Sequence, residues 1–281
     1  MKEYQLTTKQ LTAFADHLKA EERSPGTIDK YMRDIRAFVI WLDGRPVSRE
    51  AVMGWKEALL SRHYSPATLN SMLAALNRLF AFLGWHDCRV RALKIQRKAF
   101  RDASCDLTRK EYLRLVTEAR RVGRIRLALV METIGSIGIR VSETAYITVE
   151  AARKGQAVIR LKGKVRTILL PDTLCRKLLN YAKKQKIASG EIFLTRNGTV
   201  LSRKQIWREM KSLCRTAGIA ASKVFPHNLR HLFAKAFYKA THDIVKLADV
   251  LGHTNIETTR IYLISTGVEH RNLLESLRLL C

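Results

Sequence analysis

The chain has 281 residues, 47% of them hydrophobic, so it is long and apolar enough for two folded domains and is not a disordered protein. Lys and Arg number 51 against 25 Asp and Glu, which gives a formal net charge of +26, split as +7 over residues 1–100 and +19 over 101–281. Because protein surfaces usually mix both signs, this excess favours nucleic acid as the partner.

Neither the cysteines nor the hydropathy pattern indicates a secreted or a membrane protein. The five cysteines are odd in number and lack the spacing of a zinc site or a CxxC motif, so reduced thiols are expected. No apolar run approaches the roughly 18 residues that a membrane helix needs, and the first residues do not resemble a signal peptide. These features predict a cytoplasmic protein without a membrane partner.

The first part of the chain has the pattern of four helices. Ser24-Pro25 and Ser65-Pro66 each place an N-cap residue before a proline suited to the first helical position. Thr7-Thr8 precede an amphipathic run, and Ser48 can cap a further helix. We therefore predict a four-helix N-terminal domain within residues 1–90.

Residues 91–106 are rich in Lys and Arg and show little periodicity, which predicts a basic linker that crosses a phosphate backbone. A solvated surface loop explains any one of these side chains equally well. Thr108 and Glu111 then form a capping-box pattern. This pattern opens the second predicted domain, residues 107–281.

The second domain combines helices with a few short strands. Helices are predicted to about Tyr146, followed by strands at 157–161 and 166–170 that residues 162–165 join as a hairpin. Helical patterns resume after Pro171 and are interrupted by one short strand candidate at 192–194. The remaining predicted helices are 202–217, 226–240, 244–251 and 268–280. The predicted fold class is mainly α: a helical N-terminal domain plus an α+β domain with a small antiparallel sheet.

The candidate chemistry lies between residues 226 and 262, which contain His227, Arg230, His253 and Tyr262. Cleaving a phosphodiester needs a nucleophile, an acid for the leaving oxygen, and cations that face the non-bridging oxygens. Arginine suits the last task because its planar fork grips two oxygens and it does not deprotonate. The sequence shows no cluster of Asp and Glu suited to Mg²⁺, so we predict a site without metal or cofactor.

These residues resemble the signature of the tyrosine recombinase (phage integrase) family, in its short, Xer-like, two-domain form. The matching segments are Gly138-Ile139-Arg140-Val141-Ser142-Glu143, Lys162-Gly163-Lys164 with Arg166, His227-Asn228-Leu229-Arg230-His231, Leu251-Gly252-His253, and Tyr262. Their order and spacing agree with the family, because 23 residues separate Arg230 from His253 and nine separate His253 from Tyr262. Ile137 departs from the pattern, since the family usually has threonine there.

The resemblance extends over residues 105–281 and, more weakly, over the N-terminal helices as a SAM-like core DNA-binding domain. It implies a site-specific DNA recombinase or integrase that cuts and rejoins duplex DNA through a 3′-phosphotyrosyl intermediate and a four-way junction. The implied catalytic residues are Arg140, Lys162, His227, Arg230, His253 and Tyr262.

The roles that the resemblance implies differ from residue to residue. Tyr262 would be the nucleophile, and the two arginines would clamp the scissile phosphate. His227 would act as an acid/base or phosphate donor, and His253 as a second donor. Lys162 would protonate the leaving 5′-oxygen, with Lys164 as the alternative, whereas His231 and Glu143 would be structural.

The resemblance also implies partners: a double-stranded DNA recombination site, a homotetramer on that DNA, and an accessory DNA-bending protein as a further candidate, all at a bacterial nucleoid. The apolar stretch over 273–280 fits docking on a neighbouring protomer and closure of the chain's own core equally well. Three alternatives to a recombinase are a type IB topoisomerase, a non-catalytic DNA-binding protein of the same fold, and a metal-dependent nuclease. The DNA target, and the choice between a mobile-element integrase, a dimer resolvase and an inversion switch, stay open.

Overall fold

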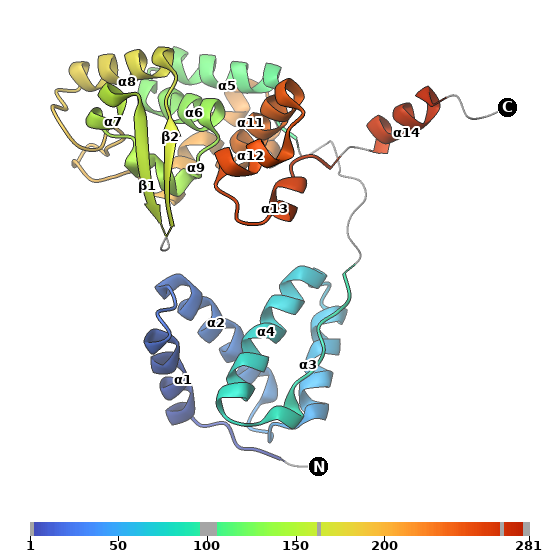
Figure 1. Ribbon diagram of the computed structural model, residues 1–281. Coiled ribbons are helices and arrows are strands. Elements are labelled where there is room, and N and C mark those ends of the chain that lie inside the picture. Colours follow the sequence, from blue (N-terminus) through green and yellow to red (C-terminus); the bar gives the residue numbers. More distant parts are fainter. Residues whose placement is uncertain (1–2, 96–105, 162–163, 265–266, 278–281) are drawn as a thin grey trace. The chain divides into compact units, whose positions relative to one another are not determined.

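The structure is a computed structural model that describes residues 3–95, 106–161, 164–264 and 267–277 (Figure 1). The chain divides into two compact units, residues 1–97 and 98–281. None of the helices among the described residues is long and apolar enough to cross a membrane. The predicted fold class, mainly α with a small antiparallel sheet in the second unit, is confirmed.

Within its described residues, 3–95, the N-terminal unit has four helices and a short 3₁₀ turn: α1 (Thr8–Ala20), α2 (Pro25–Leu42), α3 (Arg49–Ser61), α4 (Pro66–Phe82) and η1 (His86–Cys88). Each α-helix begins at the predicted cap, because the side chains of Thr7, Ser24, Ser48 and Ser65 accept a hydrogen bond from a backbone N–H in the first turn. The helices pack around a continuous apolar core that includes Phe14, Phe38, Trp55 and Phe80.

Two asparagines of α4 hold the chain that leaves this unit. The amide of Asn77 both donates to the carbonyl of Val90 and accepts from its N–H, at 2.9 and 3.1 Å. Asn70 makes the same pair of bonds with Leu93, at 2.9 and 2.8 Å. The first residues of the predicted linker 91–106 are therefore attached to the N-terminal unit, and residues 96–105 lie outside the described part. The function and the limits of this linker stay predictions.

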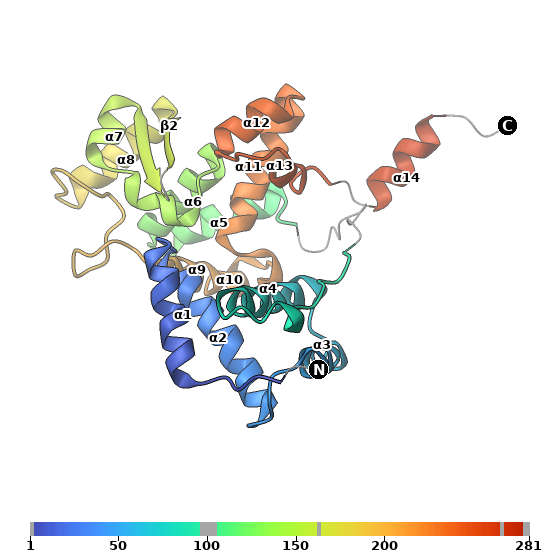
Figure 2. The same ribbon diagram turned by 60° about the horizontal axis from the view of Figure 1, so that its bottom comes forward.

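The second unit begins at the predicted capping box, where Thr108 and Glu111 bond to each other's backbone N–H groups. Its elements are α5 (Arg109–Arg121), α6 (Ile125–Ile137), η3 (Val141–Tyr146), α7 (Val149–Lys154), β1 (Gln156–Leu161), β2 (Lys164–Leu169), α8 (Asp172–Lys184), α9 (Arg203–Lys211), α10 (Cys214–Ala217), η4 (Ala221–Lys223), α11 (Pro226–Thr241), α12 (Ile244–Leu251), α13 (Glu257–Arg260) and α14 (Gly267–Ser276). Helix α6 is apolar on nearly all sides because it runs through the core, in contact with α5, α8 and α11. In Figures 1 and 2, α11 lies between α6 and α12, so residues far apart in sequence meet there.

The predicted strands differ from the structure in detail. The antiparallel pairing of β1 and β2 runs from Gln156↔Leu169 to Leu161↔Lys164, so the ladder begins two residues earlier on the second strand than predicted. Within the predicted strand at 192–194, Leu194 makes a single isolated bridge, to Val200, while Ile192 and Phe193 are buried in the core.

The predicted helix at 202–217 is in fact two helices, α9 and α10. At the break, the guanidinium of Arg124 donates to the hydroxyl of Ser212 and to the carbonyl of Glu209. That carbonyl would bond to a later N–H if the helix continued. The hydroxyl of Ser212 donates to the same carbonyl at 2.8 Å, so a local side chain and the distant Arg124 together bind the Glu209 carbonyl where α9 ends.

We expect Asn77→Ala to lower the free energy of unfolding of the N-terminal unit by about 1–3 kcal/mol, because the buried backbone of Val90 loses both partners. Urea unfolding followed by tryptophan fluorescence reports on this unit, which holds three of the four tryptophans. Lys56→Ala is the control, since it removes a single exposed bond to the Arg91 carbonyl and should change stability by less than about 0.5 kcal/mol. Equal effects of the two variants would contradict this account.

Candidate active site

Four segments of the second unit converge on Arg230. Helix α11 carries His227, Arg230 and His231. Arg230 binds Gly138, the residue after α6, and Leu251, the last residue of α12. Tyr262 follows α13 and lies against α11. Arg140 lines the same cavity as His227 and Arg230, so five of the six residues predicted to be catalytic lie together. The sixth, Lys162, lies outside the described residues.

Arg230 is 2% exposed, and its guanidinium binds four acceptors. Nη1 donates to the carbonyl of Gly138 at 2.6 Å, and Nη2 donates to the carbonyl of Leu251 at 2.8 Å. Nη2 also lies 2.8 Å from Nε2 of His253, and Nε donates to the Tyr262 hydroxyl at 3.4 Å. Burial lowers the pKa of Arg230, although from so high a value that it stays charged. None of these four acceptors is a carboxylate, so the positive charge stays uncompensated within its hydrogen-bond shell.

His253 is held through both ring nitrogens. Since arginine can only donate, Nε2 must accept from Arg230, and the proton of the neutral ring is then on Nδ1, 2.8 Å from Oγ1 of Thr259. Burial and then the charges of Arg230, Arg140 and Arg166 lower the pKa of His253 to about 4, so the ring is neutral near pH 7. The donor role toward a phosphate that the resemblance implies for His253 stays a prediction.

Tyr262 is 5% exposed and is surrounded by histidines. Its ring is stacked on that of His253, with centroids 5.8 Å apart and planes at 10°. The centroids of His231 and His227 lie 5.1 and 5.6 Å away. The Tyr262 hydroxyl accepts from Nε of Arg230, so it lies next to a buried cation of its own chain.

The second arginine, Arg140, shares a carboxylate with Arg166. Glu143 is 1% exposed and accepts from the backbone N–H and the Nη1 of Arg140 at 2.7 and 2.9 Å. It also accepts from Nη2 of Arg166 on β2 at 2.6 Å. Nη1 of Arg166 reaches the carbonyl of Val250 at 2.8 Å, which ties the hairpin to the end of α12. Burial lowers the pKa of Arg166.

Two glycines end helices where a side chain would not fit. Gly138 has a φ of +65°, and a Cβ there would lie 2.3 Å from the ring of Phe233. Gly252 has a φ of +66°, and a Cβ there would lie 2.5 Å from Nη1 of Arg166. Ile137, which departs from the family pattern, is the last residue of α6 and is buried in the core.

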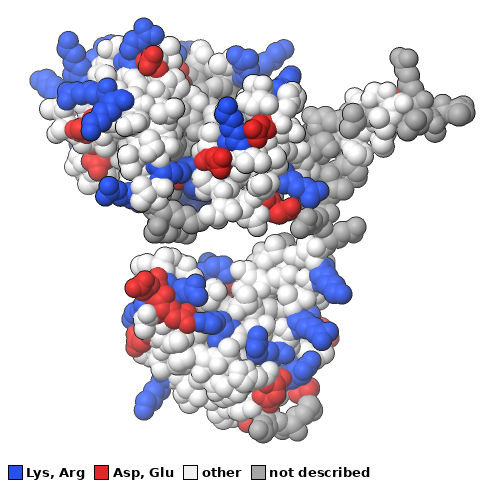
Figure 3. All heavy atoms as spheres, in the orientation of Figure 1, with Lys and Arg blue, Asp and Glu red and all other residues white. Residues whose placement is uncertain are grey.

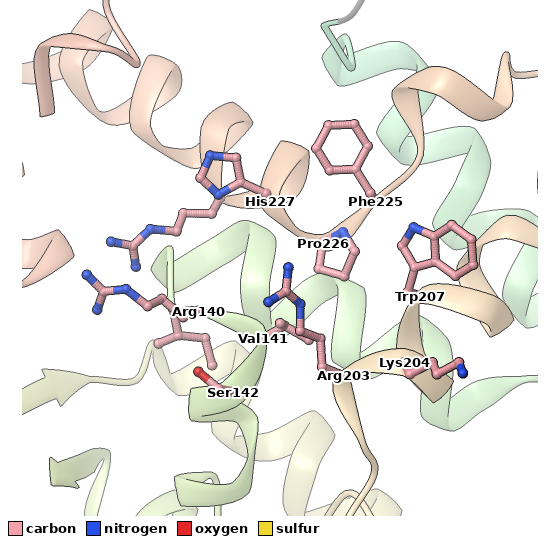
Figure 4. A pocket seen from close by; sticks show the side chains of 11 residues that line it. Arg140, Val141, Ser142, Arg203, Lys204, Trp207, Phe225, Pro226 and His227 are labelled. Carbon is pink, nitrogen blue, oxygen red and sulfur yellow. The ribbon is translucent and has the colours of Figure 1, made fainter. Parts of the chain in front are cut away.

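A cavity of about 590 Å³ opens beside the site. Arg140, His227 and Arg230 line one side of it, and Arg203 and Trp207 of α9 line the other (Figure 4). Figure 4 shows the guanidinium of Arg203 between Arg140 and Trp207. The cavity therefore presents several cations to a ligand while keeping an apolar wall. Outside the cavity, Figure 3 shows further Lys and Arg side chains on the visible face of both units.

The sequence did not single out Arg203, Trp207 or Thr259. The resemblance includes Arg166 only as part of the segment around Lys162 and Lys164, and implies only a structural role for Glu143. Glu143 binds Arg166, which is 23 residues away, and Arg203 and Trp207 line a cavity with residues of α11, so these contacts join segments distant in sequence. Thr259 contacts His253, six residues before it, but this contact belongs to no motif that the sequence predicted. Among the described residues, no group of three or more His, Cys, Asp or Glu side chains is arranged to hold a metal ion.

The geometry defines a site of tyrosine-recombinase type, and comparison with known proteins agrees. The model of the phage integrase family matches residues 106–267, and that of the phage integrase N-terminal SAM-like domain matches residues 11–87. The chain belongs to the phage integrase family, and the prediction of a tyrosine-type site-specific recombinase is confirmed.

Relatives and solved structures place the chain more closely. It is 32% identical to the tyrosine recombinase XerA of Pyrococcus furiosus over 293 residues, which cover 99% of both chains. It is 30% identical to the tyrosine recombinase XerC of Roseiflexus castenholzii, covering 90% of this chain and 88% of the other. Its fold is similar to that of a lambda integrase tetramer bound to a Holliday junction, with a TM-score of 0.73 at 19% identity over 92% of this chain and 77% of the other.

We expect Gly252→Ala to reduce both stability and DNA cleavage. The left-handed backbone costs about 1–2 kcal/mol for any residue with a Cβ, and the new methyl group also displaces the Arg166 guanidinium from Val250. Gly123→Ala is a matched control, because Gly123 has a φ of +75° with nothing within 4 Å.

The control should show the backbone cost alone and keep the wild-type cleavage rate. Chemical unfolding followed by circular dichroism and single-turnover cleavage measure the two effects. Equal loss of stability in both variants, with cleavage unchanged, would mean that the contact between Arg166 and Gly252 has no role in the site.

Proposed function

We propose that this recombinase cleaves one DNA strand at a time with Tyr262 as the nucleophile, acting in the active site of its own chain. The observation that carries the proposal is the contact between the Tyr262 hydroxyl and Nε of Arg230. A phosphate bound by Arg230 would lie beside that hydroxyl. The attacking oxygen and the cation that stabilises the transition state would then come from one polypeptide.

The proposed reaction is a transesterification that keeps the phosphodiester count constant. The Tyr262 oxygen forms a bond to phosphorus as the bond from phosphorus to the 5′-oxygen breaks. The products are a 3′-phosphotyrosyl link and a free 5′-hydroxyl. Attack by a 5′-hydroxyl of the partner duplex reverses these bonds and releases the tyrosine. Because the energy of the linkage is retained, the exchange does not require ATP.

The two arginines and His227 have distinct proposed tasks. Arg230 and Arg140 bind the non-bridging oxygens, where negative charge accumulates in the transition state. Two contacts support this task by leaving positive charge available to a phosphate. Arg230 has no carboxylate among its four acceptors, and Arg140 shares its carboxylate, Glu143, with Arg166. His227 lines the cavity and lies near Tyr262, which suits a group that accepts the tyrosine proton or binds the phosphate. We propose Lys162 as the acid for the leaving 5′-oxygen, with Lys164 as the alternative, on the resemblance alone.

The proposed substrate is a double-stranded recombination site, with four protomers joining two such sites through a four-way junction. The net charge of +26, present in both halves of the chain, supports a duplex that both units contact. The tetramer is supported by the structure of lambda integrase on a Holliday junction. We further propose that the protein acts at the nucleoid, and an accessory DNA-bending protein stays a prediction from the resemblance.

We expect Tyr262→Phe to bind duplex DNA with the wild-type dissociation constant and to form no covalent DNA complex, because it loses only the attacking oxygen. The protein is mixed with fragmented genomic DNA of its source organism in EDTA and denatured in SDS. The DNA that stays attached is then sequenced.

Tyr181→Phe, which alters a partly buried tyrosine packed on the core away from the site, is the matched control and should cross-link like the wild type. Covalent DNA on Tyr262→Phe would assign the nucleophile elsewhere. A wild-type protein that binds duplex DNA but captures none under these conditions would contradict the proposed reaction.

We expect Arg230→Lys to reduce the single-turnover cleavage rate by about 100-fold, on the sequence recovered by covalent capture. Lysine keeps the charge but cannot reach the Gly138 and Leu251 carbonyls and a phosphate together. Affinity for the duplex should fall only slightly, because one phosphate contact is a small part of the total. Cleavage near the wild-type rate would show that charge alone suffices at this position.

A further inference from the structure

We infer that Thr259 is a positioning residue of this active site: its hydroxyl accepts the Nδ1 proton of His253 and thereby leaves Nε2 free to hold the guanidinium of Arg230. The tautomer assignment rests on the geometry alone. Its consequence for cleavage rests on the proposed function, in which Arg230 binds the scissile phosphate.

The chain of contacts begins at a side chain that water does not reach. Thr259 lies in α13 and is 0% exposed. Its Oγ1 is 2.8 Å from Nδ1 of His253, and Nε2 of the same ring is 2.8 Å from Nη2 of Arg230. Guanidinium groups have no lone pair to offer, so the proton cannot be on Nε2. Arg230 thus fixes the ring proton on Nδ1, and the buried Thr259 hydroxyl is the acceptor that satisfies it.

The other tautomer would place two donors against each other. With the proton on Nε2, that N–H would face the N–H of Arg230, and the two groups would repel at 2.8 Å. Arg230 would then keep only the carbonyls of Gly138 and Leu251 and the more distant tyrosine hydroxyl. The guanidinium would lose a good acceptor and the orientation that this acceptor imposes. A buried donor without an acceptor is costly, so the guanidinium would move.

Thr259 also holds the nucleophile through its backbone. Its carbonyl accepts from the N–H of Tyr262 at 3.0 Å, and its own N–H donates to the carbonyl of Ile256 at 2.8 Å. The same residue thus begins the turn that carries Tyr262 and, through its side chain, accepts from the ring stacked on Tyr262. The hydroxyl is the only part of this arrangement that a substitution by valine removes, because valine has the shape of threonine.

The neighbouring threonine provides an internal control. The hydroxyl of Thr258 is exposed and donates to the Asn255 carbonyl at 2.6 Å, on the same short helix. Its replacement by valine makes the same chemical change one residue away, without touching His253. Any general effect of valine on α13 would appear in both variants.

The first experiment measures the tautomer directly in the full-length wild-type protein. The protein is labelled with ¹⁵N-histidine, and long-range ¹H–¹⁵N correlation spectra are recorded near pH 7. The signals of His253 are assigned by their loss in His253→Gln. We expect a protonated Nδ1 and an unprotonated Nε2 in the wild type. A protonated Nε2 in the wild-type spectrum would overturn the inference, whatever the enzyme does to DNA.

The second experiment follows catalysis. We expect Thr259→Val to lower the single-turnover cleavage rate about tenfold, the effect of a lost buried hydrogen bond, with an unchanged dissociation constant for the duplex. Thr259→Ser, which restores the hydroxyl, and Thr258→Val should both stay within about twofold of the wild type. The ¹⁵N spectrum of Thr259→Val should show loss of the pure Nδ1–H tautomer.

The outcomes separate the two claims. A wild-type rate for Thr259→Val, or an equal loss in Thr259→Ser, would overturn the positioning role. If the tautomer is as inferred but the wild type forms no covalent complex with DNA, the proposed function fails while the tautomer assignment stands. Should Thr259→Val not fold, the wild-type spectrum and the Thr259→Ser rate still decide the matter.

Discussion

The site depends on one buried cation that no carboxylate neutralises within hydrogen-bond distance. Arg230 is almost inaccessible, and such burial would be prohibitive without full hydrogen bonding. Two of its acceptors are the carbonyls of Gly138 and Leu251, which stand at the C-terminal ends of α6 and α12. Those carbonyls have no partner within their own helices, and helix C-termini carry partial negative charge. Two helix ends therefore stabilise the guanidinium while leaving its full charge for an anionic substrate.

The carboxylate of the site, Glu143, is bound to Arg140 and Arg166. It accepts from Arg140 and Arg166, so two positive charges share one negative charge. A buried carboxylate needs such partners, and the excess of cations is what a phosphate would neutralise. Through Arg166 the same carboxylate connects the β-hairpin to the carbonyl of Val250. The positions of the hairpin, of Arg140 and of the α12 end are thus coupled by one network.

Much of this could be predicted from sequence, and the parts that could not have a common cause. Helix starts at Ser24, Ser65 and Thr108 were predictable because a cap and its N–H partner lie within three residues. The end of α9 was not, because the Glu209 carbonyl there is bound by Arg124, which lies far away in sequence, as well as by the nearby Ser212. The same limit applies to His253. Its place in the site follows from the motif, but the direction of its hydrogen bonds depends on which nitrogen faces Arg230 and which faces Thr259.

The two motif glycines show how a local pattern can have a distant reason. Each adopts a positive φ that ends a helix, and any residue with that backbone would end the helix there. Glycine is needed for a second reason, because Phe233 and Arg166 occupy the space where a Cβ would lie. The helix ends can approach α11 and β2 closely only without that atom. The acceptors of Arg230 then come within reach, so the absence of two side chains is part of what positions the cation.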